Sequence, residues 1–476
     1  MAEFDAVIIG SGPNGLAAAI AIAQQGGRVL VLESRDTPGG GSRTAELTLP
    51  GFHHDVCSAV HPTAMASPFF QSLPLADHGL EFIHPDIPLA HPFDDGECAV
   101  MHQSLEATAA ALGEDAEAYQ KLFAPLLKNA DALFEQLLAP PIRLPKNPFA
   151  MASFGLKAMR SASGLSTSYF KSDAARALFA GNAAHSFMPL SAPFTAAIGL
   201  VIMLSGHRYG WPVAKGGSGN ITQALCSLLE SLGGKIECGY EVTDIAELPT
   251  AKAYLFDTSP RALQQIAGDR LPVRYTRSLS KFRHGPGIFK ADYALSDPIP
   301  WTAEPCRRAG TVHVGGPLAE IEAAERATWQ HHQHERPFIL VAQQSLCDPS
   351  RAPEGKHTAW VYAHVPAGSD ADISETIEAQ LERFAPGFRD CVLAKHTMNC
   401  NEVEAYNANN IGGDIAGGAN SWRQVFMRPV ARINPYTTPA DDIFICSAST
   451  PPGGGVHGMC GYHAAQAALK RISRAE

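Results

Sequence analysis

The chain has 476 residues, 45% of them hydrophobic and 18% charged, which is the composition of a globular protein. A chain of this length exceeds the size at which one hydrophobic core usually stops growing, so we expect two domains. The formal net charge of −10 and the lack of clustered lysines and arginines argue against nucleic-acid binding, because neutralising phosphates requires grouped cations.

Two further features bear on the compartment and on metal binding. The N-terminal stretch MAEFDAVIIG enters an apolar strand without a basic segment or a long apolar run, so we expect no secretory signal and a cytoplasmic protein. The ten cysteines follow neither a CxxC spacing nor a regular framework, which indicates reduced and mostly buried thiols. We therefore predict no metal site and no redox disulfide.

The first predicted element is a strand that leads through a glycine-rich turn into a helix. The glycines have GxGxxG spacing, which permits a tight turn, close approach of a pyrophosphate and close packing of helix on strand. The helix N-terminus offers N–H groups and a positive dipole to phosphates, and the acid that ends the next strand would accept a hydrogen bond from a ribose hydroxyl. The segment predicts an adenine dinucleotide, held by Gly10, Gly12, Pro13, Asn14, Gly15, Glu33 and Ser34.

A second glycine cluster, Gly39 to Gly41, follows this unit, and a simple NAD dehydrogenase has no need of glycines there. The stretch resembles the ExxxxxGGR-like sequence of flavoproteins in the amine oxidase and carotenoid desaturase group. That resemblance implies FAD as the cofactor, with Gly40 and Gly41 passing close to the pyrophosphate and the flavin ring. The chain departs from the group at one place, because Gly41 stands where the arginine is usual; Arg43 is the candidate replacement.

The next stretch, GFHHDVCSAVHP, lies between the flavin and the substrate cavity in that group. Asp55 matches a recurring acid of the family. The resemblance leaves two roles open for it, structural hydrogen bonding or a place in the active site.

Two segments of the following region stand out by composition. Residues 139–149 are rich in proline and predict either a lid or a surface connection. Residues 187–204 are the most apolar stretch, but the part after Pro193 is about ten residues long, well short of the roughly twenty that a membrane-spanning helix requires. We predict a buried or interfacial helix and no transmembrane span, with peripheral membrane contact left open.

Residues 206–245 resemble the phytoene desaturase-like flavoproteins, in which a helix with the pattern GG.G.L..AL precedes a glycine, a strand and a V..I ending. The resemblance implies that the backbone of Val242, at the end of that strand, contacts the adenine side of FAD. The glycines at 216, 217 and 219 lack GxGxxG spacing and follow no clear strand, so a second nucleotide domain is not expected.

The C-terminal segment predicts a strand over 443–446, a polar turn, three glycines at 453–455 and a helix. In the group this arrangement closes the flavin site, with the glycines against the isoalloxazine. His457 is the candidate general base because imidazole titrates near neutrality; the alternative is that it caps the turn or fills space. The implied flavin contacts here are Gly455, Val456, Gly458 and Met459.

The resemblance and the order of predicted elements imply an α/β fold with a Rossmann-type FAD-binding domain of the glutathione reductase-like kind and a discontinuous α+β substrate domain. We assign residues 1–75, 210–270 and 426–476 to the FAD-binding domain. Residues 76–209 and 271–425 are assigned to the substrate domain.

The function implied by the resemblance is an FAD-dependent dehydrogenase or desaturase that transfers a hydride from a small, largely apolar substrate to flavin N5. The electron acceptor, oxygen or a quinone, and the oligomeric state stay open. Three alternatives remain: an amine oxidase that releases hydrogen peroxide, a double-bond isomerase without net redox, and a non-catalytic assembly protein.

Overall fold

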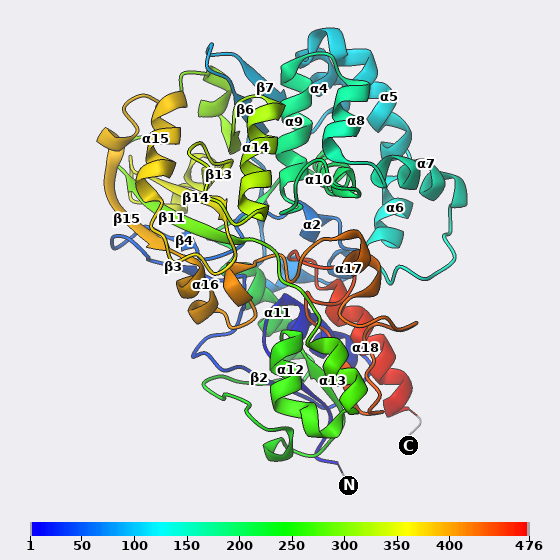
Figure 1. Ribbon diagram of the computed structural model, residues 1–476. Coiled ribbons are helices and arrows are strands. Elements are labelled where there is room, and N and C mark those ends of the chain that lie inside the picture. The colour runs from blue at the N-terminus through cyan, green and yellow to red at the C-terminus, as the bar shows by residue number, and fades with distance from the viewer. Residues whose placement is uncertain (1, 474–476) are drawn as a thin grey trace.

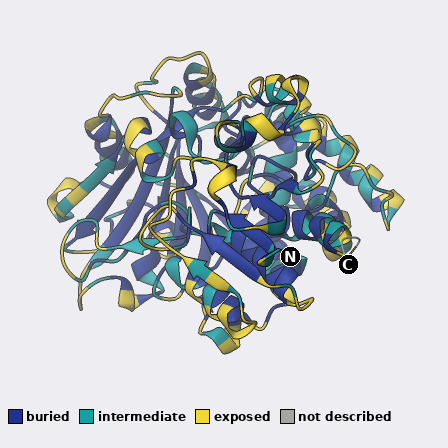
Figure 2. Cartoon of the chain, turned by 90° about the horizontal axis from the view of Figure 1, so that it is seen from below, coloured by how far each residue is buried: buried dark blue, intermediate teal, exposed yellow. Residues whose placement is uncertain are grey.

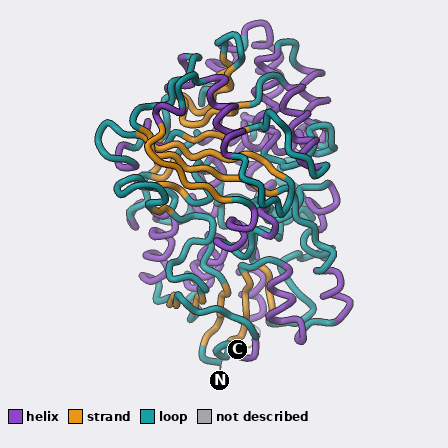
Figure 3. The backbone as a smooth tube through the Cα atoms, turned by 60° about the vertical axis from the view of Figure 1, so that its left-hand side comes forward, coloured by secondary structure: helices purple, strands orange, loops and turns teal. Residues whose placement is uncertain are grey.

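The computed structural model describes residues 2–473, which build two β-sheets and a group of helices beside them (Figure 1). The smaller sheet lies next to both ends of the described chain, and the larger sheet lies above it in Figure 3. Figure 2 shows that most of the strands are buried and that exposed residues gather on the outer helices and loops.

The smaller sheet has five parallel strands in the order β16-β10-β1-β2-β9. Helices cover both of its faces. Alternate residues of the central strand, β1, therefore pack in two different hydrophobic cores. Ala6 and Ile8 pack in the core that includes α1, whereas Val7 and Ile9 pack with helices α12 and α13. The strands are β1 (Phe4–Ile9), β2 (Val29–Leu32), β9 (Lys235–Glu237), β10 (Ala251–Phe256) and β16 (Ile443–Ile445); the covering helices are α1 (Pro13–Ala23), α11 (Gly219–Ser231), α12 (Pro260–Ala267), α13 (Val273–Leu279) and α18 (Met459–Ile472).

The larger sheet has seven strands in the order β15-β11-β14-β13-β12-β6-β7, and only the β6–β12 pair is parallel. Its two faces again enter different cores. In β14, Val361 packs towards helix α15, whereas Trp360 and Tyr362 face the interior between the sheets. The elements are β6 (Ile87–Pro92), β7 (Cys98–Met101), β11 (Gly287–Leu295), β12 (Ala309–Val314), β13 (Ile339–Ala342), β14 (His357–Val365), β15 (Val392–Met398), α14 (Leu318–Trp329) and α15 (Ser374–Phe384).

A group of helices completes the interior beside the larger sheet (Figure 1). The apolar segment 187–204 forms the helix predicted for it only from Thr195, since Pro189 and Pro193 precede it and Phe194 takes a left-handed conformation at its N-cap. The longer helices are α4 (Leu105–Ala111), α5 (Ala116–Leu127), α6 (Ala130–Leu137), α7 (Pro148–Ala158), α8 (Ala162–Tyr169), α9 (Asp173–Ala184) and α10 (Thr195–Tyr209).

Short elements connect the layers. Two-stranded sheets pair β3 (Thr44–Ala45) with β4 (His54–Asp55) and β5 (Phe82–Ile83) with β8 (Val213–Ala214), and the remaining short helices are α2 (Pro62–Met65), α3 (Pro68–Gln71), α16 (Cys400–Tyr406) and α17 (Trp422–Met427). Within residues 2–473, no helix is both long enough and apolar enough to cross a bilayer.

The strands of the two sheets come from different parts of the chain. All five parallel strands lie within residues 1–75, 210–270 and 426–476, and the seven strands of the larger sheet lie within the other two segments. The division into domains stays a prediction, and helix α13, which packs on the parallel sheet, lies beyond the predicted boundary at residue 270. One local expectation is wrong: Val242 is not in a strand, because β9 ends at Glu237 and Gly239, with φ +70°, turns the chain away.

Candidate active site

A cavity of about 1080 Å³ runs between the two sheets. Its size slightly exceeds the range for single ligand pockets, roughly 300–1,000 Å³, so it has room for a cofactor and a second molecule. The carboxyl edge of the parallel sheet forms one part of its wall, and the larger sheet with helices α7 and α10 forms the other. Ligands of open parallel sheets bind at that carboxyl edge.

The glycine-rich turn lines the cavity and leaves no room for side chains. A β-carbon on Gly12 would lie 2.6 Å from Oδ2 of Asp257, and one on Gly10, whose φ is +100°, would lie 2.8 Å from the carbonyl oxygen of Asp257. A β-carbon on Gly40 would lie 3.0 Å from Cα of Gly12, so the second glycine cluster passes directly over the first. The wall of the cavity is therefore bare glycine backbone at this place, and a ligand can approach it closely.

The N-terminus of α1 fits a diphosphate. Gly12 is its N-cap without a side chain, Pro13 has no N–H, and the Gly15 N–H donates to Asp257, so the Asn14 N–H and the helix dipole are what this first turn offers an anion. Asn14, one residue into the helix, lines the cavity, and its Oδ1 is buried without a hydrogen-bond partner in the described chain. A buried polar atom without a partner at this position indicates that a ligand is expected there.

Glu33 stands at the end of β2 and is 6% exposed. Its Oε2 accepts hydrogen bonds from the backbone N–H (3.0 Å) and the hydroxyl (2.6 Å) of Ser11, and its Oε1 lies 3.5 Å from the guanidinium of Arg43. The backbone N–H of Tyr240 donates to the Glu33 carbonyl (2.8 Å), which brings the loop with Val242 against the same acid. Glu33, Arg43 and Val242 all line the cavity, as an adenosine site requires.

Asp257, which directly follows β10, is a second acid beneath the glycine-rich turn. Its Oδ2 accepts a hydrogen bond from the backbone N–H of Gly15 (2.8 Å). Burial raises the pKa of this carboxyl from 3.8 to about 7; the Gly15 hydrogen bond lowers it, and the nearby charge of Glu33 adds to the rise. A carboxyl with such a raised pKa is partly protonated near neutral pH, which reduces its repulsion of a diphosphate.

The C-terminal glycine loop packs against protein on one side and the cavity on the other. A β-carbon on Gly453 would lie 2.7 Å from the guanidinium of Arg428, and one on Gly454 would lie 2.6 Å from the carbonyl oxygen of Ala416. Gly454 and Gly455 line the cavity, the latter with φ +127°. The first glycine of the triplet therefore serves internal packing, and the next two form cavity wall.

His457 also lines the cavity and is 1% exposed. Its Nδ1 accepts a hydrogen bond from the backbone N–H of Met459 (3.1 Å), the first residue of α18. Burial lowers the pKa of this imidazole to about 4. The hydrogen bond to Met459 is the capping contact of the alternative interpretation of His457. A general base that works near neutral pH would need a higher pKa than this buried imidazole has. The catalytic role stays a prediction.

Asp55 is not among the residues that line the cavity, and it is fully buried. Its Oδ2 lies 2.8 Å from the guanidinium of Arg351, and its Oδ1 accepts hydrogen bonds from the Ser218 backbone N–H (2.7 Å) and the Thr44 hydroxyl (2.8 Å). The Arg351 ion pair and these hydrogen bonds hold the pKa of the carboxyl below its usual value against the effect of burial. The contacts favour the structural role of Asp55.

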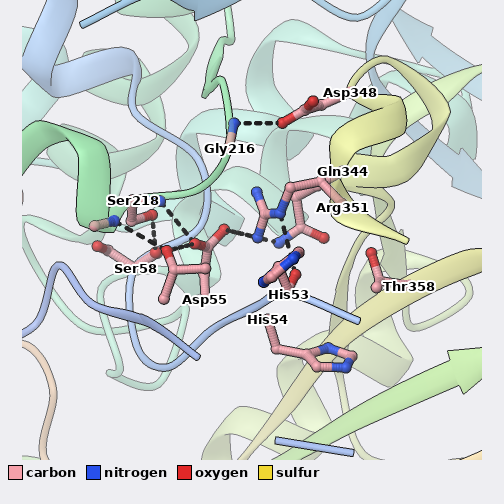
Figure 4. Close-up of polar contacts among 12 residues, drawn as sticks. His53, His54, Asp55, Ser58, Gly216, Ser218, Gln344, Asp348, Arg351 and Thr358 are labelled. Carbon is pink, nitrogen blue, oxygen red and sulfur yellow. Dashed lines mark hydrogen bonds and ion pairs between the residues drawn. The ribbon is translucent and has the colours of Figure 1, made fainter. Parts of the chain in front are cut away.

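The cluster around Asp55 also joins distant segments (Figure 4). Arg351 donates through Nε to the carbonyl oxygen of His53 (3.1 Å), and the neighbouring Asp348 accepts from the Gly216 backbone N–H (2.7 Å). The loop after β13 is thereby fixed to two segments that run beside the parallel sheet. The sequence predicts neither Asp257 nor Arg351; its only signal for Asp257 is an acid directly after the apolar run 253–256.

The part of the cavity away from the glycine-rich turn is apolar. Among all lining residues the acids are Glu33, Glu241 and Asp257, and all three belong to the dinucleotide-binding part. Burial lowers the pKa of His185, a histidine of the apolar part, to about 3, so it is neutral at pH 7. The side chains of this part are Met151, Phe154, Phe194, Val201, Ile202, Leu340, Trp360 and Tyr362, among others.

The structure brings most of the predicted site residues together. Gly15 lies just beneath the cavity, and Gly458 and Met459 lie behind its wall, where α18 packs against Phe70 and α1. The predicted residues that line the cavity are Gly10, Gly12, Pro13, Asn14, Glu33, Ser34, Gly40, Gly41, Arg43, Val242, Gly455, Val456 and His457.

Comparison with known proteins agrees with this geometry. Residues 8–73 match the family described as an NAD(P)-binding Rossmann-like domain. Over 99% of its length the chain is 24% identical to pyridine nucleotide-disulfide oxidoreductase domain-containing protein 2 of Mus musculus, of which it covers 94%. Over 96% of its length it is 24% identical to phytoene desaturase (neurosporene-forming) of Rhodobacter capsulatus, of which it covers 92%. The chain is a homologue of these oxidoreductases.

Among solved structures, putrescine oxidase bound to putrescine has a TM-score of 0.64 and 17% identity, with 99% of each chain covered. This likeness establishes the fold. The predicted resemblance to the phytoene desaturase-like branch, the fold class and the oxidoreductase class are therefore confirmed, together with a Rossmann-like nucleotide-binding domain.

Proposed function

We propose that this protein is an FAD-dependent dehydrogenase or desaturase that oxidises a largely apolar substrate. The observation that carries the proposal is one continuous cavity with a dinucleotide-binding turn at one part and an acid-free, apolar chamber at the other. FAD, when bound, supplies an acceptor for a hydride from a substrate C–H bond. An NAD(P) cofactor would leave the second glycine cluster and the C-terminal loop without a ligand.

Different residues of the cavity would bind the cofactor and the substrate. The α1 N-terminus and the turn around Gly12 hold the diphosphate, and Glu33 holds the ribose. Gly454 and Gly455 let backbone form the wall nearest the substrate chamber. The chamber excludes water by its apolar side chains and orients an apolar substrate by shape.

The absence of a carboxylate in the described lining of the chamber favours an apolar substrate over a cationic amine, since a buried ammonium group without a partner is costly. Peroxide-forming amine oxidation, isomerisation without net redox and a non-catalytic role are the competing hypotheses. The electron acceptor, oxygen or a quinone, and a cytoplasmic location stay predictions.

The test is anaerobic mixing of the purified protein with apolar alkenes, alicyclic ketones and primary amines, followed by the visible absorbance of the bound flavin. We expect bleaching with a member of the apolar set and none with the amines. Bleaching by amines alone, with peroxide formed on admission of oxygen, would identify an amine oxidase. Rearrangement of an alkene without bleaching would identify an isomerase.

A further inference from the structure

Exposed apolar side chains are concentrated on one part of the surface. Fifteen large hydrophobic side chains are exposed in the described chain, and nine of them lie in residues 141–160 and 421–433. We call these two segments together the apolar rim. Its exposure is high, with Leu144 at 93% and Phe149 at 89%. Grouped exposure of this kind marks an interaction site, whereas single exposed apolar residues do not. The nine residues are Ile142, Leu144, Phe149, Leu156, Met159, Trp422, Phe426, Met427 and Ile433.

The two segments are neighbours in space, and they surround an opening of the cavity. Phe194 joins them, because its ring lies 5.6 Å from that of Phe426 and its backbone N–H donates to the Met159 carbonyl (3.3 Å). Met159 and Phe426 both line the cavity and are 50% and 47% exposed, so the cavity reaches the surface between them. Figure 1 shows α7 and α17 on the same side of the molecule, with α6 between them.

The charge of the rim is opposite to that of the chain. The protein carries a net charge of −10, yet neither segment of the rim contains an aspartate or a glutamate. One cation, Lys146, forms an ion pair with Glu135 of α6, and Arg428 is buried. The cations of the rim are Arg143, Lys146, Lys157, Arg160, Arg423, Arg428 and Arg432.

The exposed apolar side chains and the excess of cations distinguish between two possible partners of the rim, a second copy of the chain and a lipid surface. In a symmetric dimer the rim would meet its own copy, and cations of both copies would face one another without acids to pair with. An anionic lipid surface instead accepts apolar side chains between its acyl chains and attracts lysine and arginine at its head groups.

We propose that the apolar rim docks on an anionic phospholipid surface, with the mouth of the cavity facing the lipid. Apolar molecules dissolved in that lipid would then enter the chamber between Met159 and Phe426 without crossing water. The docking itself does not depend on the reaction proposed above, so the two proposals can fail separately.

The test is co-sedimentation of the purified, cofactor-containing protein with vesicles of phosphatidylcholine alone or mixed with phosphatidylglycerol. We expect binding to the mixed vesicles that weakens as salt screens the charges. The double variant Leu144→Glu/Phe149→Glu should lose this binding. Val273→Glu is the matched control, since Val273 is 71% exposed on α13, outside the rim.

The charge requirement has its own pair of variants. Arg143→Gln/Arg423→Gln, at a half-buried and an exposed arginine of the rim, should weaken binding to mixed vesicles by on the order of tenfold, because each cation near an anionic surface contributes separately. Arg274→Gln/Arg277→Gln, on α13 outside the rim, should not change it. Circular dichroism and retained cofactor show that each variant is folded.

Three results would overturn the proposal. The first is that the protein does not bind mixed vesicles. The second is that the rim variants and the α13 variants lose the same share of vesicle binding. The third is that the protein does not bind vesicles and light scattering shows a dimer that the rim variants disrupt. The last result would assign the rim to a second copy of the chain.

Discussion

Replacing Asp257 by asparagine should stabilise the protein, and only above acidic pH. The carboxyl has a pKa of about 7 in the folded chain and an ordinary value of 3.8. Below about pH 4 it is protonated in both the folded and the unfolded state, so it does not alter the free energy of unfolding. Between about pH 4 and 7 it ionises only on unfolding, so the free energy of unfolding falls as pH rises. Above about pH 7 the carboxyl is ionised in both states, so the free energy of unfolding no longer changes with pH through this group.

The difference of about three pKa units corresponds to at most about 4 kcal/mol. The amide introduced by Asp257→Asn would keep an oxygen for the Gly15 N–H, which the Asp257 carboxylate accepts at 2.8 Å, but would carry no charge to desolvate. The assay compares urea unfolding midpoints of both proteins from about pH 4 to 9. We expect equal midpoints at the acidic end and a more stable variant from neutral pH upwards. A difference that does not change with pH, or a variant less stable throughout, would refute the reasoning.

The remaining predictions concern the cofactor turn, the C-terminal loop and the buried ion pair of Asp55. Gly12→Val should lose bound FAD, because its β-carbon would lie 2.6 Å from Oδ2 of Asp257 and displace the turn that approaches the diphosphate; normal flavin content in a folded variant would contradict this placement. His457→Ala should lower stability by about 1 kcal/mol through the lost contact to Met459, with flavin reduction slowed less than tenfold. A slowing of about 100-fold, with loss of a pH-dependent limb, would establish the general base instead. Arg351→Met should destabilise the protein by about 3–5 kcal/mol by leaving Asp55 buried and unpaired, and unchanged urea unfolding would argue against that pair.

The sequence predicts the local parts of this site well. The run from Ala6 to Glu33 contains strand, turn, helix and acid within one short segment, and spacing alone fixes their relative positions. The resemblance to a flavoprotein group assigns the second glycine cluster and the loop at 453–455 to the same cavity, although these stretches are far apart in the chain.

What could not be predicted depends on contacts between distant residues. The Gly15 N–H meets Asp257 across 242 positions, and Gln344 lies 3.3 Å from Asp55 across 289 positions. Periodicity describes one element at a time, so it cannot show which acid lies beneath which turn. The same limit explains His457, because burial, not the residue type, sets its pKa, and burial is a property of the whole fold.

The apolar rim, too, could not be predicted from local sequence patterns. The composition of residues 139–149 predicts a lid or a surface connection, and nothing in that stretch shows that residues 421–433 lie on the same side of the molecule. Only the folded chain brings the two acid-free segments together around the mouth of the cavity.

The most direct test of the central claim is the identity of the molecule that the protein releases. Purified protein should be yellow, and heat denaturation should release non-covalently bound FAD, in about one equivalent per chain, as identified by chromatography and by its fluorescence before and after phosphodiesterase cleavage. Release of FMN or of a nicotinamide dinucleotide, or of no nucleotide from protein that also fails to bind added FAD, would contradict the assignment of this cavity to FAD.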